Sequence, residues 1–167
     1  MSKTNENLKV ALAGESQANR QYLAFAKKAE EENLPGVAKL FRAAAESETV
    51  HALKYLKMLG EINSTKENLE AAKGGETEEA EKMYPQFVAE AEAENETVAK
   101  NSFAWAGKVE GLHAGMYGEA LDKVSSGEDI TEKEYYICQG CGYTTPDEAP
   151  EVCPVCGAPK SMFKKVE

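Results

Sequence analysis

The feature that most constrains the fold is a Glu-x-x-His pair that occurs twice in helical segments. The pairs are Glu48/His51 and Glu110/His113, and they contain the only two histidines of the chain. Aromatic positions repeat with the same offset of 62 residues: Tyr22/Tyr84, Phe25/Phe87 and Phe41/Phe103. The repeat therefore predicts two copies of a helix pair, related by approximate twofold symmetry, that offer ligands to one central site.

Periodicity and chain breakers define the first two helices. Residues 4–32 have helical periodicity, and the sequence Asn33-Leu34-Pro35-Gly36 ends that helix. Proline suits the first turn of a helix, so the second helix is predicted from Pro35 to about Gly60. Residues 61–75 are polar and are expected to form a connection, with room for a short helix after Thr65 and an end at Gly74-Gly75.

The third helix is predicted to begin near Glu76 and to bend at Pro85, and the fourth is predicted over 95–125. Four helices joined by short turns and one longer connection are typical of a bundle. Residues 1–134 are therefore expected to form one helical domain. Glu15 matches Glu76 only when the repeat offset slips by one residue.

The remaining residues, 135–167, are rich in Pro, Gly and Cys and have no helical period. Cys138-x-x-Cys141 and Cys153-x-x-Cys156 form two knuckles separated by 11 residues. Two such knuckles indicate a tetrahedral four-thiolate metal site, which would hold together a domain too small to fold alone. Zinc and iron share this ligand set, and a redox-active partner site in the same chain favours iron.

Composition narrows the class of protein. The net charge of −10 argues against nucleic acid and anionic membrane as partners. No stretch has the length of a membrane span, and the N-terminus lacks a signal-peptide core. We therefore expect a cytoplasmic protein, and a reducing compartment favours metal ligation by the cysteines over disulfides.

Residues i and i+3 share a face of a helix, so each Glu-x-x-His pair can bind one metal region. Glu15 and Glu76 would come from the two other helices, which completes the ligand pattern of di-iron and di-manganese carboxylate bundles. Mixed oxygen and imidazole ligands suit iron or manganese. Glu79 is an additional carboxylate without a counterpart near Glu15. The phenols of Tyr22 and Tyr84 are expected to support the glutamates one to two turns before them.

Several segments together resemble the rubrerythrin family. They are "AGESQANRQY", "AAAESETVHA", "GETEEAEKMYP", "VEGLHA" and "YICQGCGYTTPDEAPEVCPVCGAPK". The resemblance covers nearly the whole chain and implies a ferritin-like four-helix bundle followed by a rubredoxin-like domain. It also implies three irons per chain. Two would be held by Glu15, Glu48, His51, Glu76, Glu79, Glu110 and His113, with Glu48 and Glu110 bridging, and one by Cys138, Cys141, Cys153 and Cys156.

The resemblance implies reduction of hydrogen peroxide to water. Electrons would reach the di-iron site from the rubredoxin-type centre, which an external rubredoxin or an NAD(P)H-dependent reductase would supply. One iron would move between Glu79 and His51, since ferric iron prefers carboxylate and ferrous iron accepts imidazole more readily. The family passes electrons between neighbouring chains, so at least a dimer is expected, and helix exchange between subunits stays open.

Two other functions are compatible with parts of the pattern. A ferritin-type ferroxidase would use the same carboxylates, but it takes electrons from its substrate iron and has no need of an electron carrier. A non-catalytic bundle with a structural zinc ribbon would account for the cysteines, but not for the paired Glu-x-x-His elements or for Glu79.

Overall fold

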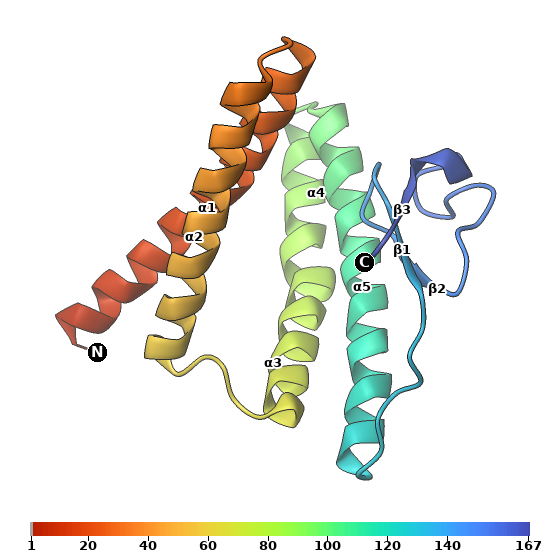
Figure 1. The fold of residues 1–167 in the computed structure, drawn as a ribbon. Helices are drawn as coiled ribbons and strands as arrows, with labels where there is room; N and C mark the ends of the chain where they lie inside the picture. Colours follow the sequence, from red (N-terminus) through yellow and green to blue (C-terminus); the bar gives the residue numbers. More distant parts are fainter. Residues whose placement is uncertain (1) are drawn as a thin grey trace. The chain divides into compact units, whose positions relative to one another are not determined.

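The computed structural model describes residues 2–167 and divides the chain into two compact units, residues up to 63 and residues 64–167. The first unit is an antiparallel hairpin of α1 (Lys3–Glu31) and α2 (Pro35–Leu59) (Figure 1). The Ser2 side chain caps α1 by accepting a hydrogen bond from the Asn5 amide, and α2 ends at Gly60 in the left-handed conformation. Both helices lie within one residue of their predicted bounds.

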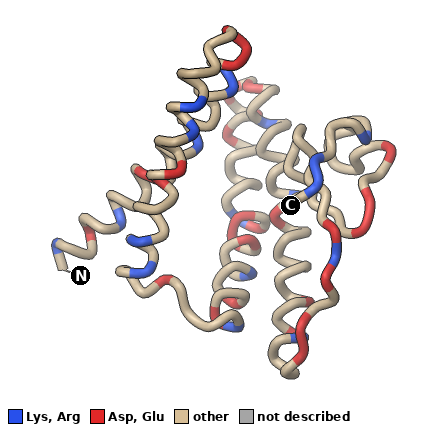
Figure 2. The backbone as a smooth tube through the Cα atoms, viewed as in Figure 1, with Lys and Arg blue, Asp and Glu red and all other residues tan. Residues whose placement is uncertain are grey.

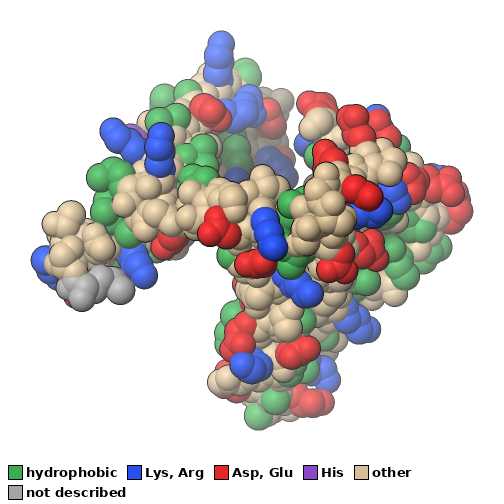
Figure 3. Space-filling view, turned by 90° about the horizontal axis from the view of Figure 1, so that it is seen from below, with side chains coloured by type: hydrophobic (Ala, Val, Ile, Leu, Met, Phe, Trp, Pro, Cys, Tyr) green, Lys and Arg blue, Asp and Glu red, His purple; other side chains and the backbone are tan. Residues whose placement is uncertain are grey.

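Alanines fill the interface between α1 and α2. The buried ones are Ala26, Ala29, Ala38 and Ala45. Charged side chains occur along both helices (Figure 2), but large apolar ones are exposed too, and the space-filling view shows apolar areas on the surface (Figure 3). Those of the hairpin are Val10, Leu23, Phe25, Leu34, Val37, Leu40, Val50, Leu53 and Met58. The small interface side chains let the two helices approach closely, while much of the apolar surface of the hairpin is left uncovered.

The second unit contains another antiparallel helical pair. One side is the succession of α3 (Thr65–Glu78), the π-helical segment η1 (Glu79–Met83) and α4 (Tyr84–Ala93), and the other side is α5 (Thr97–Ser125). The chain reverses at Asn95, which has a positive φ of 62°. The predicted fourth helix therefore lies within two residues of α5 at its start and coincides with it at its end.

The predicted start of the third helix was wrong by about eleven residues, because α3 begins at Thr65 instead of near Glu76. Ser64 and Glu67 form a reciprocal capping box, in which each side chain bonds to the backbone of the other. Gly74 and Gly75 lie inside the helix instead of ending it. Glycine costs roughly 1 kcal/mol in a helix interior, which packing and capping can offset.

The second unit ends in a small antiparallel sheet. Its strands are β1 (Tyr135–Cys138), β2 (Thr144–Pro146) and β3 (Phe163–Lys165), in the order β2-β1-β3. A short 3-10 helix, η2 (Lys160–Met162), precedes β3. Ile137 of β1 pairs with Thr144 on one side and Lys164 on the other. Residues 135–167 are thus built of short strands and turns, as predicted.

Acidic and basic side chains alternate along the segment that joins α5 to β1 (Figure 2). In this segment Glu128 pairs with Lys123 at the end of α5, and Glu134 pairs with Lys165 of β3. Within residues 2–167, no helix is both long and apolar enough to cross a membrane.

Candidate metal centres

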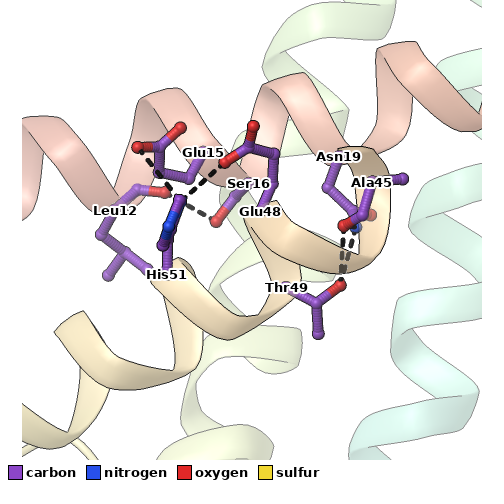
Figure 4. A network of polar contacts seen from close by, with 8 residues as sticks. All are labelled: Leu12, Glu15, Ser16, Asn19, Ala45, Glu48, Thr49 and His51. Carbon is purple, nitrogen blue, oxygen red and sulfur yellow. Dashed lines mark hydrogen bonds and ion pairs between the residues drawn. The ribbon is translucent and has the colours of Figure 1, made fainter. Parts of the chain in front are cut away.

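The first candidate centre lies between α1 and α2. His51 Nδ1 is 2.8 Å from Glu48 Oε2 and 3.9 Å from Glu15 Oε1, so the ring faces both carboxylates (Figure 4). The spacing of three residues places Glu48 and His51 on one face of α2, and Glu15 approaches from α1. The His51 side chain is 46% exposed. No hydrogen bond reaches its Nε2 from the part of the chain that the structure describes.

The second candidate centre repeats this geometry between α3 and α5. His113 Nδ1 is 2.9 Å from Glu110 Oε2 and 3.8 Å from Glu76 Oε1. The corresponding distances in the two centres differ by only 0.1 Å. His113 is less exposed than His51, at 26%, and its Nε2 lies 2.9 Å from Thr144 Oγ1. The internal repeat of the sequence therefore corresponds to two similar groups of side chains.

Carboxylates crowd the second centre. Burial, and then the nearby Glu110 carboxylate, raise the pKa of Glu76 above its ordinary value, against the attraction of His113. Burial, followed by Glu110, Glu79 and Glu76, likewise raises the pKa of the Tyr84 phenol. A bound cation would relieve this repulsion, because it would balance the carboxylate charges.

Each centre offers three donors that lie within 4.8 Å of one another, from Glu15, Glu48 and His51 and from Glu76, Glu110 and His113. Carboxylate oxygens and imidazole nitrogens suit divalent iron or manganese, so both groups fit a metal ligand set. Glu79 is not part of either group, although its charge acts on Glu76 and Tyr84. The structure thus brings six of the seven predicted ligands together as two groups of three.

The predicted supporting tyrosines belong to two matching aromatic clusters. Tyr22 packs against Phe25 and Phe41, with ring centroids 6.4 and 6.2 Å apart. Tyr84 packs in the same way, at 6.1 Å from Phe87 and 6.4 Å from Phe103. Neither phenol makes a hydrogen bond to a glutamate within the described residues, so the supporting role of the tyrosines stays a prediction.

The four cysteines converge in the small sheet region. All four are free, and their sulfurs lie within 4.8 Å of one another. The Cys138–Cys156 and Cys141–Cys153 Sγ separations are 3.7 and 3.6 Å. A tetrahedral site with metal–sulfur bonds of about 2.3 Å requires sulfurs about 3.8 Å apart. The thiols are therefore spaced for one tetrahedral ion.

The backbone around these cysteines favours thiolates. Gly142 and Gly157 each follow the second cysteine of a knuckle and have φ values of +83° and +78°, which glycine adopts without strain. Burial opposes ionisation of Cys153, but amide donors from Cys156 and Val155, with the neighbouring thiols, lower its pKa to about 7. Burial raises the pKa of Cys141. A metal ion would replace the protons of such thiols.

Two features of the sites were missed by the sequence reasoning. Thr144, beside His113, lies outside every motif and has no sequence signal. The π-helical segment Glu79–Met83 did have a signal, because the repeat offset is 61 at Glu76 and 62 at Tyr84. A π segment adds one residue to a helix, and it lies between these two positions.

Comparison with known proteins covers both regions of the chain. Residues 6–121 match the rubrerythrin family model, and residues 136–164 match the rubredoxin-like domain of rubrerythrin. Rubrerythrin-2 of Clostridium acetobutylicum is 35% identical, over 96% of this chain and 95% of its own length. Nigerythrin of Nitratidesulfovibrio vulgaris is 33% identical, over 96% of this chain and 85% of its own.

Solved structures agree with these sequence relatives. Nigerythrin in its fully reduced, all-ferrous state matches with a TM-score of 0.57 and 32% identity, over 99% of this chain and 88% of the nigerythrin chain. The predicted fold class is confirmed, with ferritin-like helices followed by a rubredoxin-like four-cysteine domain. The helices, the two carboxylate–histidine groups and the cysteine site all agree with one assignment: this chain belongs to the rubrerythrin family.

Proposed function

We propose that this chain reduces hydrogen peroxide to water at a di-iron site. The observation that carries the proposal is the pair of matched groups, each with two carboxylates and one imidazole at nearly equal distances. The proposed ligands are Glu15, Glu48, His51, Glu76, Glu79, Glu110 and His113. When bound, the iron pair would supply the two electrons of the reaction H2O2 + 2 e− + 2 H+ → 2 H2O.

The protein side chains have distinct proposed roles. Glu48 and Glu110 lie closest to the histidines and are the proposed bridging ligands. Glu79 and His51 are proposed to exchange as ligands of one iron between oxidation states. This exchange is supported by the position of Glu79 outside the three-residue groups and by the exposure of His51, whose ring is free of tertiary hydrogen bonds at Nε2 within residues 2–167.

The four-thiolate site is proposed to hold a third iron and to carry electrons one at a time. This assignment treats residues 1–134 and 135–167 as the catalytic and the electron-carrier domain. The proposed external donor is a rubredoxin or an NAD(P)H-dependent rubredoxin reductase. The free state of all four cysteines supports a reducing compartment, the cytoplasm, where the activity would protect against oxidative stress.

We further propose that the protein acts as a homodimer or a higher oligomer. Each three-residue group offers a single imidazole and two carboxylates, which is half of the proposed ligand set without Glu79. A complete site requires an α1–α2 hairpin and an α3–α5 pair, from one chain or by exchange between two chains. The exposed apolar side chains of α1 and α2 support a partner that covers them.

Anaerobic rapid mixing tests the proposed reaction. The iron-loaded protein is reduced and mixed with hydrogen peroxide or with dioxygen, while the visible band of the four-thiolate iron is followed. A return of ferric colour that is faster with peroxide supports the proposal, and a faster return with dioxygen would favour a ferroxidase or oxidase. Absence of any colour would indicate zinc or an empty thiolate site and would contradict the electron-carrier role.

A pair of variants on α5 assigns the signal to the proposed site. Glu110→Ala removes the carboxylate nearest to His113 and is expected to abolish the peroxide-driven return of colour. Glu119→Ala removes an exposed carboxylate from the same helix and is expected to leave the return unchanged. Equal rates in Glu110→Ala and the unmodified protein would place the peroxide chemistry elsewhere.

A further inference from the structure

His113 uses both of its ring nitrogens. Nδ1 faces Glu110 at 2.9 Å, and Nε2 lies 2.9 Å from the hydroxyl oxygen of Thr144, in strand β2 of the small domain. A nitrogen that binds a metal cannot carry a proton, so a neutral ring that ligates through Nδ1 has its proton on Nε2. That N–H then donates to Thr144 Oγ1.

The Thr144 hydroxyl has a second partner that fixes its direction. It donates its own proton to the carbonyl oxygen of Gly142, at 3.2 Å. Gly142 directly follows Cys141, one of the four thiolate ligands. A continuous path therefore runs from Cys141 through the Gly142 carbonyl and the Thr144 hydroxyl to the ring of His113, and all of it lies within one chain.

Packing next to this path holds the small domain against α5. Val109 is buried, one turn before His113 on α5, and a Cβ placed on Gly142 would lie 3.9 Å from Val109 Cγ1. The first centre has no such connection, because Nε2 of His51 has no hydrogen-bond partner within residues 2–167. Only the second centre is thus linked to the cysteine site.

We propose that Thr144 is a positioning residue that holds the His113 ring and couples it to the Cys141 loop of the same chain. The inference rests on the proposed function for its redox role, and it replaces transfer from a neighbouring chain with transfer within one chain. Reduction of one peroxide takes two single-electron transfers, each of which oxidises a ferrous four-thiolate iron to ferric. The two protons come from solvent, while the protons on Thr144 and His113 keep their positions.

Variants of Thr144 test the redox role. Thr144→Val keeps the shape but removes the hydroxyl, so peroxide-driven oxidation of the four-thiolate iron is expected to slow by roughly tenfold or more, as for other supports of metal ligands. Thr144→Ser restores the hydroxyl and should restore the rate. Thr145→Val, at the next position of β2, is the matched control, since the Thr145 hydroxyl bonds only to the Pro146 carbonyl. An unchanged rate in Thr144→Val would overturn the proposal.

A second readout does not depend on activity. In the zinc-substituted full chain, nitrogen-15 NMR of the two histidines should show a slowly exchanging Nε2 proton on His113, which Thr144→Val should expose to fast exchange. Fast exchange already in the unmodified chain would overturn the positioning role. Failure of the unmodified iron protein to react with peroxide would instead contradict the proposed function, and the NMR result would still decide the hydrogen bond.

Mixed assemblies separate transfer within one chain from transfer between chains. One chain carries Cys141→Ser and Cys153→Ser, and the other carries His113→Ala, with different affinity tags so that mixed assemblies can be purified. Transfer within one chain predicts no peroxide-driven oxidation of the four-thiolate iron beyond that of the His113→Ala protein alone. Recovery of a rate near that of the unmodified protein would overturn the same-chain path.

Discussion

Gly107 of α5 lies directly against Tyr84 of α4: a Cβ placed on Gly107 would be only 2.9 Å from the Tyr84 Cβ. Such a distance is far shorter than ordinary carbon–carbon contact. Tyr84 is the first residue after the π-helical segment and belongs to the aromatic cluster with Phe87 and Phe103. The absence of a side chain at position 107 therefore sets how closely α4 and α5 pack beside the second centre.

Gly107→Ala is expected to destabilise the protein by about 1–3 kcal/mol, because the new methyl group must displace Tyr84 or α4. Gly115→Ala is the matched control on the same helix, since nothing lies within 4 Å of a Cβ at that position. That control should raise stability by up to about 1 kcal/mol through helix propensity. Thermal unfolding followed by circular dichroism measures both changes, and equal effects of the two substitutions would contradict the close approach.

Asn19→Ala should weaken the hairpin of α1 and α2. The Asn19 side chain is buried and donates from Nδ2 to the Ala45 carbonyl at 2.7 Å and to Thr49 Oγ1 at 2.8 Å (Figure 4). Loss of this link is expected to cost about 1–2 kcal/mol. Hydrogen exchange of the α1 and α2 amides should therefore accelerate by roughly tenfold. Ser16→Ala removes an exposed, local hydrogen bond to Leu12 and should leave the exchange rates unchanged.

The start of α3 should depend on pH through Glu67. The hydrogen bonds from the Ser64 side chain and backbone lower the pKa of Glu67. The stabilisation by this carboxylate is therefore complete above the ordinary glutamate pKa of about 4.3 and is lost as the pH falls through the lower, folded-state pKa. Cα chemical shifts of Thr65 to Glu67 should lose helical character over that range. Ser64→Ala should remove this pH dependence, and the same titration in both proteins would contradict it.

Removal of the metal from the cysteine site should unfold the small sheet and leave α5 folded. In residues 135–167 the buried side chains are Cys138, Cys153 and Ala149, so two of the three are metal ligands. A region with so little apolar burial depends on its metal for folding. Amide exchange in β1 should become fast after chelation, with the α1 amides as an internal control. Continued protection of β1 in the metal-free protein would show that the sheet folds without its ion.

His51→Ala should slow turnover with peroxide by at least roughly tenfold, since removal of a ligand costs no less than removal of a support for one. The visible spectrum of the four-thiolate site should not change, because His51 lies on α2, in the first unit. Glu46→Ala, an exposed carboxylate on the same helix, is the control. Unchanged turnover in His51→Ala would mean that ligand exchange between Glu79 and His51 is unnecessary here.

Local signals were sufficient to predict most of the elements. The stop at Asn33 to Gly36 and the left-handed Gly60 were readable, since proline and glycine act on the backbone of their own turn. The start of α3 was missed, because the two glycines at 74 and 75 outweighed the capping box at Ser64. A weak propensity penalty inside a helix is overridden when the same helix packs along α5 and is well capped.

The sequence by itself determined the donor types and their spacing: Glu and His three residues apart on a helix face, and two pairs of cysteines two residues apart within each pair. Those spacings act through local backbone geometry, so they hold before any packing is known. Only the tertiary structure decided that Thr144 meets His113, that Asn19 links α1 to α2, and that Glu79 lies outside the group around Glu76. These relationships join residues that are remote in sequence or separated by a π-helical turn, and packing between whole elements sets them.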